Sequence, residues 1–190
     1  MQIGNMTQGD RQLLASANLN KFGSFDLVSA EVANGNRVFD LKLLNGLPTL
    51  DTSIDAYWCP FIQGNVTPGF VDVPRLNPPR GFVLTAAMQG CALVVTSSPL
   101  GGAFFRVYHH QHPGDQGVWQ RIHNHNVQVD TVFAFDEYAD ANANAPNAFN
   151  FLFYRNSRWI IGSQAQILNM MGQAVRRQPG WPIQVLDALP

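Results

Sequence analysis

The stretch "RGFVLTAAMQGCALVVTSSPLGGAFFRVYHHQHPG", residues 80–114, carries the pattern that decides the fold. Short apolar runs rich in β-branched and aromatic residues, the types that favour strands, stand on both sides of "SPLGG", residues 98–102. The proline and glycines of this segment are typical of a turn. Two such runs joined by a short turn predict a β-hairpin.

Similar short runs, divided by glycine, proline and asparagine, recur along the chain. We expect strands in "SFDLVSAEVA", "NRVFDLKLL", "FVLTAA", "CALVVTS", "AFFRVYHH", "VQVDTVFAFDEY", "FNFLFYRN" and "RWIIGSQ". Helical periodicity favours helices only in "DRQLLASANL", residues 10–19, and "SQAQILNMMGQAVRR", residues 163–177. Long loops are expected over residues 58–81 and 138–150. The sequence therefore predicts an α+β, mainly β fold, a β-sandwich core of mixed or antiparallel strands with peripheral helices, in a single domain over residues 1–190.

Composition excludes several classes of function. Of 190 residues, 46% are apolar and only 13% are charged, and the net charge is −1. The chain therefore has enough apolar residues for a hydrophobic core. It lacks the basic patch that binds a nucleic acid or an anionic membrane. No stretch approaches the length of a membrane span. Residues 1–20 show no basic region followed by an apolar one, so a classical signal peptide is not expected.

The predicted hairpin brings a cysteine near two histidines. A five-residue turn places Cys91 opposite His109 on an otherwise apolar face, whereas a slip of one residue would place His110 there. An imidazolium beside a thiol favours the thiolate, the form that acts as a nucleophile. Gly90 leaves room for a substrate, and the Cys91 N–H would serve an oxyanion hole. The alternative is that Cys91 is a buried packing residue, or forms one disulfide with Cys59.

The motif "TAAMQGC", residues 85–91, followed by a histidine that ends the next strand, resembles a known enzyme family. It is similar to glutamine deamidases of the cytotoxic necrotizing factor type, whose superfamily includes the Burkholderia lethal factor and CheD. The resemblance implies catalytic roles for Cys91, His109 and Thr85, with the Thr85 main-chain carbonyl orienting the histidine. Gln89 departs from the family, several members of which have serine there.

The resemblance also implies a bacterial toxin or effector with a protein substrate. Cys91 would attack a glutamine carboxamide, His109 would protonate the departing ammonia, and water would release glutamate without any cofactor or metal. The expected protein is a monomer, exported or injected by a specialised route, that acts in the cytoplasm of a target cell and binds neither nucleic acid nor membrane. Transglutamination and proteolysis would use the same acyl-enzyme and stay open as alternatives.

Two further alternatives come from other residues. All five histidines lie between positions 109 and 125, and with Asp115 they suggest a zinc site in which His123 and His125 share one strand face. The second alternative is a non-enzymatic β-sandwich binding module. Its contact surface would use tryptophans, and the chain has four of them: Trp58, Trp119, Trp159 and Trp181.

Overall fold

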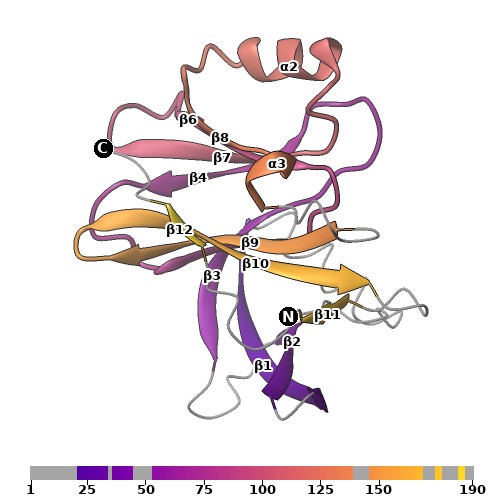
Figure 1. Ribbon diagram of the computed structural model, residues 1–190. Coiled ribbons are helices and arrows are strands. Elements are labelled where there is room, and N and C mark those ends of the chain that lie inside the picture. The colour runs from indigo at the N-terminus through magenta and orange to yellow at the C-terminus, as the bar shows by residue number, and fades with distance from the viewer. Residues whose placement is uncertain are drawn as a thin grey trace.

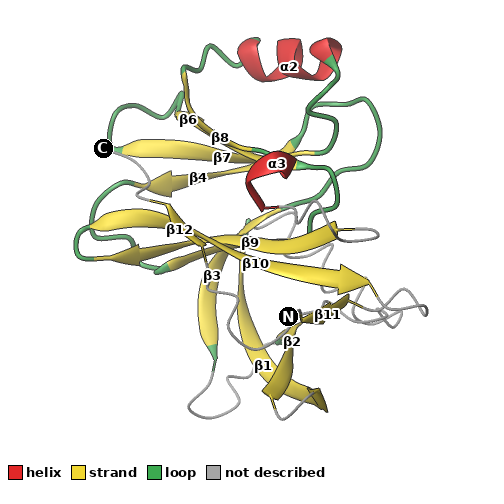
Figure 2. Ribbon diagram, viewed as in Figure 1, coloured by secondary structure: helices red, strands yellow, loops and turns green. Residues whose placement is uncertain are grey.

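The computed structural model describes residues 21–33, 36–44, 53–138, 146–168, 174–176 and 184–186. Two β-sheets stack face to face, and two short helices lie outside them (Figures 1 and 2). This architecture confirms the mainly β, α+β fold class. Within the described residues, no helix is both long enough and apolar enough to cross a membrane.

The larger sheet has the strand order β11-β10-β9-β5-β3-β1-β2, and β12 pairs with β10 outside this order. Its strands are β1 (Phe22–Ala33), β2 (Asn36–Leu43), β3 (Ile54–Cys59), β5 (Phe82–Thr85), β9 (Pro146–Arg155), β10 (Arg158–Leu168), β11 (Ala174–Arg176) and β12 (Gln184–Leu186). Neighbours run antiparallel except β3 and β5, where Tyr57 lies opposite Val83 in a parallel pair. Parallel neighbours need a crossover, and the chain makes it by passing through the other sheet.

The smaller sheet is antiparallel, in the order β4-β7-β6-β8. Its strands are β4 (Gly69–Pro74), β6 (Ala92–Ser97), β7 (Phe104–His110) and β8 (Val129–Phe133). Both faces of β6 and β7 are buried, which explains why these strands appear in the sequence as continuous apolar runs. Helix α2 (Gln116–His123) covers the outer face, where Ile122 packs with Val94 and Tyr108.

The main core lies between the two sheets. It is built from inward-facing residues of both: Tyr57, Cys59, Val71, Val73, Val83, Met88, Cys91, Leu93, Val95, Phe105, Val107, Phe133, Tyr138, Ala148, Leu152, Trp159 and Ile161. A second cluster, around Phe25 and Trp58, lies on the other face of the larger sheet. The larger sheet therefore carries buried apolar side chains on both of its faces.

The C-terminal helix prediction over residues 163–177 is wrong in the described part. Strand β10 continues to Leu168, and residues 174–176 form β11. The cause is the β9–β10 hairpin, whose tight turn has positive φ at Asn156 (53°) and Ser157 (62°). That turn sets a register reaching from Arg158 to Ile167, and ladder pairing overrides the weak helical periodicity.

Other predicted boundaries need correction as well. The expected loop over residues 58–81 contains β4, and "FDEY" forms the short helix α3 (Phe135–Tyr138) rather than a strand end. Helix α2 was not predicted, although Asp115 caps it by accepting hydrogen bonds from the Gly117 and Val118 N–H groups. The helix expected over residues 10–19, and Trp181, lie outside the described residues.

Candidate functional site

The β6–β7 hairpin exists, but its register differs from the prediction. His109 lies opposite Leu93 and His110 opposite Ala92, two positions away from the expected pairing of His109 with Cys91. The turn is longer than predicted because strand pairing ends at Ser97 and Phe105, and two successive turns fill the gap. A shift of two residues keeps every side chain on its predicted face. Cys91 and His109 therefore share the inner face without being opposite each other.

Thr85 and His109 are in direct contact across the space between the sheets. The Thr85 hydroxyl donates to the Cys59 main-chain carbonyl at 2.6 Å and lies 2.7 Å from His109 Nδ1. Because the hydroxyl proton is already used, Nδ1 must be the donor and Nε2 the unprotonated nitrogen. Burial, with the neighbouring His110, lowers the pKa of His109 to about 3. The imidazole is therefore neutral, and the Thr85 group that holds it is the hydroxyl rather than the main-chain carbonyl.

Cys91 lies at the start of the same face in an apolar setting. Its Sγ is 3.9 Å from the Gln111 carbonyl, and its own carbonyl accepts a hydrogen bond from the Tyr138 hydroxyl at 2.6 Å. Within the described residues, no hydrogen bond joins Cys91 to His109. Burial raises the pKa of the Cys91 thiol, which favours the protonated form at neutral pH. The catalytic roles of Cys91, His109 and Thr85 stay predictions.

Cys59 is the second buried thiol. Both cysteines are free, so the disulfide alternative is wrong. The Cys59 Sγ lies 3.4 Å from the Val107 carbonyl, and burial raises its pKa to about 12. This thiol is a packing residue of the core.

The five histidines are distributed over different surfaces. His109 faces the core, whereas His110 faces outward and packs against the Trp119 ring at 4.5 Å between centroids. His123 ends helix α2 and His125 follows in a loop, so they do not share a strand face. Among the described residues, no group of three or more His, Cys, Asp or Glu side chains is arranged to hold a metal ion.

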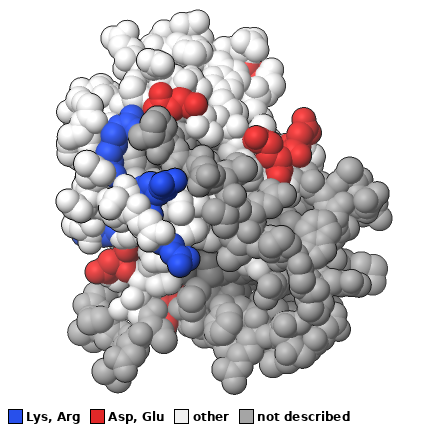
Figure 3. Space-filling model, turned by 60° about the vertical axis from the view of Figure 1, so that its left-hand side comes forward, with Lys and Arg blue, Asp and Glu red and all other residues white. Residues whose placement is uncertain are grey.

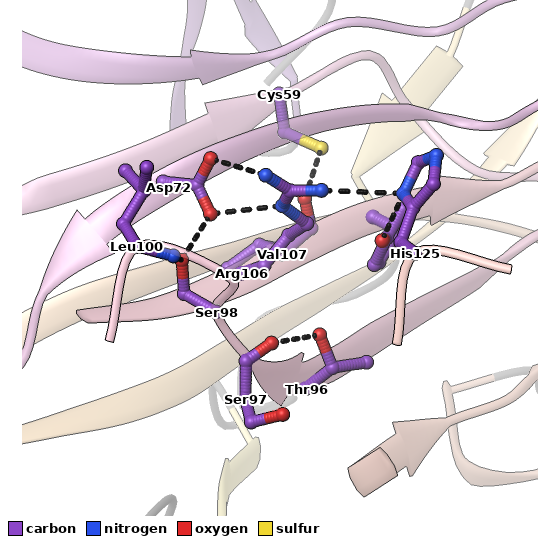
Figure 4. Close-up of polar contacts among 10 residues, drawn as sticks. Cys59, Asp72, Thr96, Ser97, Ser98, Leu100, Arg106, Val107 and His125 are labelled. Atoms are coloured by element: carbon purple, nitrogen blue, oxygen red, sulfur yellow. Dashed lines mark hydrogen bonds and ion pairs between the residues drawn. The ribbon is translucent and has the colours of Figure 1, made fainter. Parts of the chain in front are cut away.

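A polar network on the outer face of the smaller sheet was missed by sequence analysis (Figure 4). Arg106 binds Asp72 through two hydrogen bonds of 2.8 and 2.7 Å, and its third nitrogen lies 3.2 Å from His125 Nδ1. The Tyr108 hydroxyl lies 2.7 Å from the same His125 nitrogen. Because a guanidinium only donates, His125 Nδ1 is an acceptor. The network ties β4, β7 and the loop after α2 together, and it pairs the Arg106 charge with that of Asp72.

A pocket of about 410 Å³ lies at one end of the sandwich, between three turns. We call it the turn pocket, and its lining residues are Pro74, Arg75, Leu76, Gly102, Ala103, Phe104, Phe105, Ser157, Arg158 and Trp159. The Trp159 indole N–H donates to the Pro74 carbonyl at 2.9 Å, and the rings of Trp159 and Phe105 meet edge to face at 5.7 Å. The floor is therefore fixed by core aromatics, while Leu76 is 66% exposed at the margin.

Two arginines lie in the lining of the turn pocket, and one of them, Arg75, is paired with Asp130 at 3.4 Å. Among the described residues, the lining includes Arg75 and Arg158 and no carboxylate. Figure 3 presents the face that lies to the left in Figure 1, where the β9–β10 turn is found, and both basic and acidic side chains lie on it. Sequence reasoning missed this site because its residues come from three turns far apart in the chain.

A second hollow of about 890 Å³ lies beside the end of β7 and is wide open. Gln111 holds its margin in place by donating to the Gly64 and Val66 carbonyls at 2.6 and 3.1 Å. The lining is rich in neutral carboxamides and glycine, with a single carboxylate among the described residues, Asp115, that already caps helix α2. This hollow has less distinctive chemistry than the turn pocket.

Comparison with known proteins changes the functional assignment. A family model described as the Mcf1 activator-binding domain matches residues 10–184, which is most of the chain. No curated protein matches. The assignment to the cytotoxic necrotizing factor and CheD-like deamidases is therefore wrong, together with the toxin-type deamidation that it implied. That resemblance rested on a seven-residue motif and one histidine, whereas the family match extends over both sheets.

Proposed function

Because the chain belongs to the Mcf1 activator-binding domain family, we infer that it is a binding domain whose partner is a protein, the activator to which the family name refers. This function corresponds to the binding-module alternative raised by the sequence. The observation that carries the proposal in structural terms is the turn pocket, which we infer to be the docking site.

The composition of the turn pocket supports this role. Trp159, Phe105 and two arginines line it, and Trp and Arg are enriched among the residues that contribute most to protein–protein binding. Its volume of about 410 Å³ lies in the range of pockets that enclose a ligand group. The hydrogen bond from Trp159 to Pro74 and the β9–β10 ladder hold the walls before a partner arrives, and a preformed site reduces the entropy lost on binding.

Exposed leucines extend the apolar surface around this end of the sandwich. Leu76 is 66% exposed and Leu100, in the β6–β7 turn, is 63% exposed. Burying a leucine side chain contributes about 1.5–3 kcal/mol, so covering either one by a partner would add measurably to affinity. The neutral, buried states of Cys91 and His109 also support a binding rather than a hydrolytic role.

Photocrosslinking tests the proposal while the partner is still unidentified. A photoreactive amino acid is placed at Leu76, and separately at Gln120 on the exposed side of α2 as the matched control. Proteins crosslinked at Leu76 but not at Gln120 are identified by mass spectrometry, purified, and titrated calorimetrically with the unmodified domain. We expect Leu76→Asp to weaken this binding at least about tenfold, the equivalent of 1.4 kcal/mol.

Gln120→Asp provides the control for added charge, and it should leave the affinity unchanged. Crosslinking confined to Gln120, or an affinity that Leu76→Asp leaves intact, would show that the partner binds elsewhere. Both positions are exposed, so neither substitution should disturb folding.

A further inference from the structure

We propose that the α2–β8 loop, residues 124–128, is a pH-sensitive latch on the outer face of the smaller sheet. The latch is closed while the neutral imidazole of His125 accepts hydrogen bonds from β7, and it opens when His125 gains a proton. None of the loop residues lines the turn pocket, so the latch is independent of the docking site proposed there.

The loop is held at both ends by main-chain hydrogen bonds that do not depend on pH. At the helix end, the His125 and Asn126 N–H groups donate to carbonyls in the last turn of α2 at 3.0 and 2.9 Å. At the strand end, the Gln128 N–H donates to the Ser97 hydroxyl at 2.7 Å, and the Ser97 N–H donates back to the Gln128 carbonyl at 2.8 Å. Between these ends, in the part of the chain that the structure describes, only His125 joins the loop to the sheet through a side-chain hydrogen bond of its own.

The contact that His125 makes with the sheet requires a neutral ring (Figure 4). Its Nδ1 lies 3.2 Å from Arg106 Nη1 and 2.7 Å from the Tyr108 hydroxyl. A guanidinium nitrogen can only donate, so Nδ1 must carry no proton in order to accept. The ring also meets Phe70 edge to face at 5.4 Å between centroids. Both the polar and the aromatic contacts therefore place an unprotonated Nδ1 against β7.

Protonation of His125 would set one N–H against another. The imidazolium Nδ1 would become a donor facing a guanidinium that cannot accept, and the two groups would carry the same charge. Arg106 is not free to turn away, because its Nε and Nη2 donate to both oxygens of Asp72 at 2.8 and 2.7 Å. Asp72 in turn already accepts a third hydrogen bond, from the Ser98 hydroxyl at 2.7 Å. The imidazolium is therefore driven off, and the loop loses its side-chain link to the sheet.

The surroundings of His125 favour the neutral form. Burial and the charge of Arg106 lower the pKa of His125, in that order of size, while Asp72 acts in the opposite direction. A pKa that is lowered in the closed latch means that closure is fully stable above the open-state pKa, about 6.5, and is lost progressively as the pH falls below it. The other titratable groups on the elements packed around the loop are Tyr108 and His110 on β7, Asp130 on β8, Arg121 and His123 on α2, and Lys21 before β1.

Opening of the latch would uncover apolar surface. Val127, in the middle of the loop, is only 9% exposed and belongs to the cluster formed by Ile122 of α2 with Val94 and Tyr108 of the sheet. The burial of Val127 opposes opening, so we expect the latch to open as a fluctuation whose population rises in acid rather than as a complete release.

Amide hydrogen exchange followed by NMR tests the latch. The readout is the protection of the His125, Asn126 and Gln128 amides, which the closed loop keeps in hydrogen bonds, corrected for the intrinsic exchange rate at each pH. Between pH 7.5 and 5.5, protonation of the open loop multiplies its population by up to about tenfold, the limit set by an open-state pKa of about 6.5. We expect the protection of these amides to fall by about fivefold to tenfold.

Two substitutions assign this fall to His125. His125→Asn keeps an acceptor, Oδ1, near the position of Nδ1 but cannot titrate, so its fall should be smaller than that of the parent chain by about fivefold or more. His123→Asn removes an exposed histidine two residues away and should keep the full dependence. Each chain is compared with itself at two pH values, so a difference in absolute protection does not matter. Any general loss of stability in acid from His109 and His110 is common to all three chains.

The ring nitrogens give a second, independent measurement. Long-range proton–nitrogen NMR spectra at pH 7.5 should show His125 protonated on Nε2, whereas His109, which donates from Nδ1 to Thr85, should be protonated on Nδ1. A proton on Nδ1 of His125 at this pH would overturn the latch. An equal fall in protection in the parent chain and His125→Asn would overturn it as well, and neither result would bear on partner binding at the turn pocket.

Discussion

Acidification tests the buried histidines of β7. His109 has a pKa of about 3 in the folded chain, because burial disfavours the imidazolium, against 6.5 for an unperturbed histidine. Between these values the unfolded chain binds a proton that the folded chain does not. The free energy of unfolding therefore falls as the pH drops below about 7, and continues to fall until the pH nears the folded pKa.

At pH 5, the loss in the free energy of unfolding caused by His109 depends almost only on the pKa of this histidine in the unfolded chain. Protonation there stabilises the unfolded chain by RT ln(1 + 10^1.5), about 2 kcal/mol, while the folded imidazole stays neutral. His110, whose pKa is lowered to about 4 mainly by burial, adds a loss of similar size. Together the two histidines should remove about 4 kcal/mol between pH 8 and pH 5, a large part of the 5–15 kcal/mol typical of a domain.

Urea unfolding followed by tryptophan fluorescence at pH 8, 7, 6 and 5 measures this loss. His109→Gln keeps an amide donor for Thr85 but cannot titrate, so its loss over this range should be smaller by about 2 kcal/mol. His123→Gln, at the exposed end of α2, should keep the dependence of the parent chain. Two results would refute a neutral, buried His109. One is a free energy of unfolding that stays constant from pH 8 to pH 5, and the other is a pH dependence that His109→Gln leaves unchanged.

Three further predictions concern the core. Thr85→Val should lower the free energy of unfolding in urea by about 2–3 kcal/mol, because it leaves the buried Cys59 carbonyl and the His109 N–H without a partner. Thr85→Ser keeps the hydroxyl and should lower it by about 1 kcal/mol. Equal losses would argue against a hydrogen-bonding role for the hydroxyl. Gly69→Ala should lower the melting temperature far more than Gly81→Ala. A Cβ at Gly69 would overlap the Pro60 main-chain carbonyl, whereas a Cβ at Gly81 meets open space. Matching melting temperatures would contradict this packing. Iodoacetamide should label both thiols slowly at pH 7, Cys91 (8% exposed) before the fully buried Cys59; fast labelling of Cys91 in the native chain would restore the nucleophile hypothesis.

The sequence predicts the faces of the central hairpin but not its register. Alternation alone assigns Leu93, Val107 and His109 to the core face, because a strand has a period of two. Register depends on turn length, and the two consecutive turns after Ser97 leave no unambiguous signal. The prediction consequently brought His109 opposite Cys91, whereas its partner across the strand pair is Leu93, two residues further along.

Long-range pairing accounts for the other errors. Residues 163–168 contain helix-favouring side chains, yet the ladder begun at the Asn156–Ser157 turn continues through them. Strand β4 lies in a proline-rich segment, and only its pairing with β7 distinguishes it from a loop. The turn pocket could not be predicted at all, because no local pattern indicates that the residues around Arg75, Gly102 and Arg158 meet.

The position of β5 between β3 and β9 has a consequence for synthesis on the ribosome. All four strands of the smaller sheet are complete once Phe133 has emerged, and β5 can already pair with β3. The opposite edge of β5 stays unpaired until β9 has been synthesised, and β9 begins only at Pro146. Until then Phe82 and Val83, which later pair with β9, lie on an unpaired apolar edge of the kind that pairs with foreign strands. We therefore expect chains truncated before Pro146 to aggregate rather than to persist as a smaller folded sandwich.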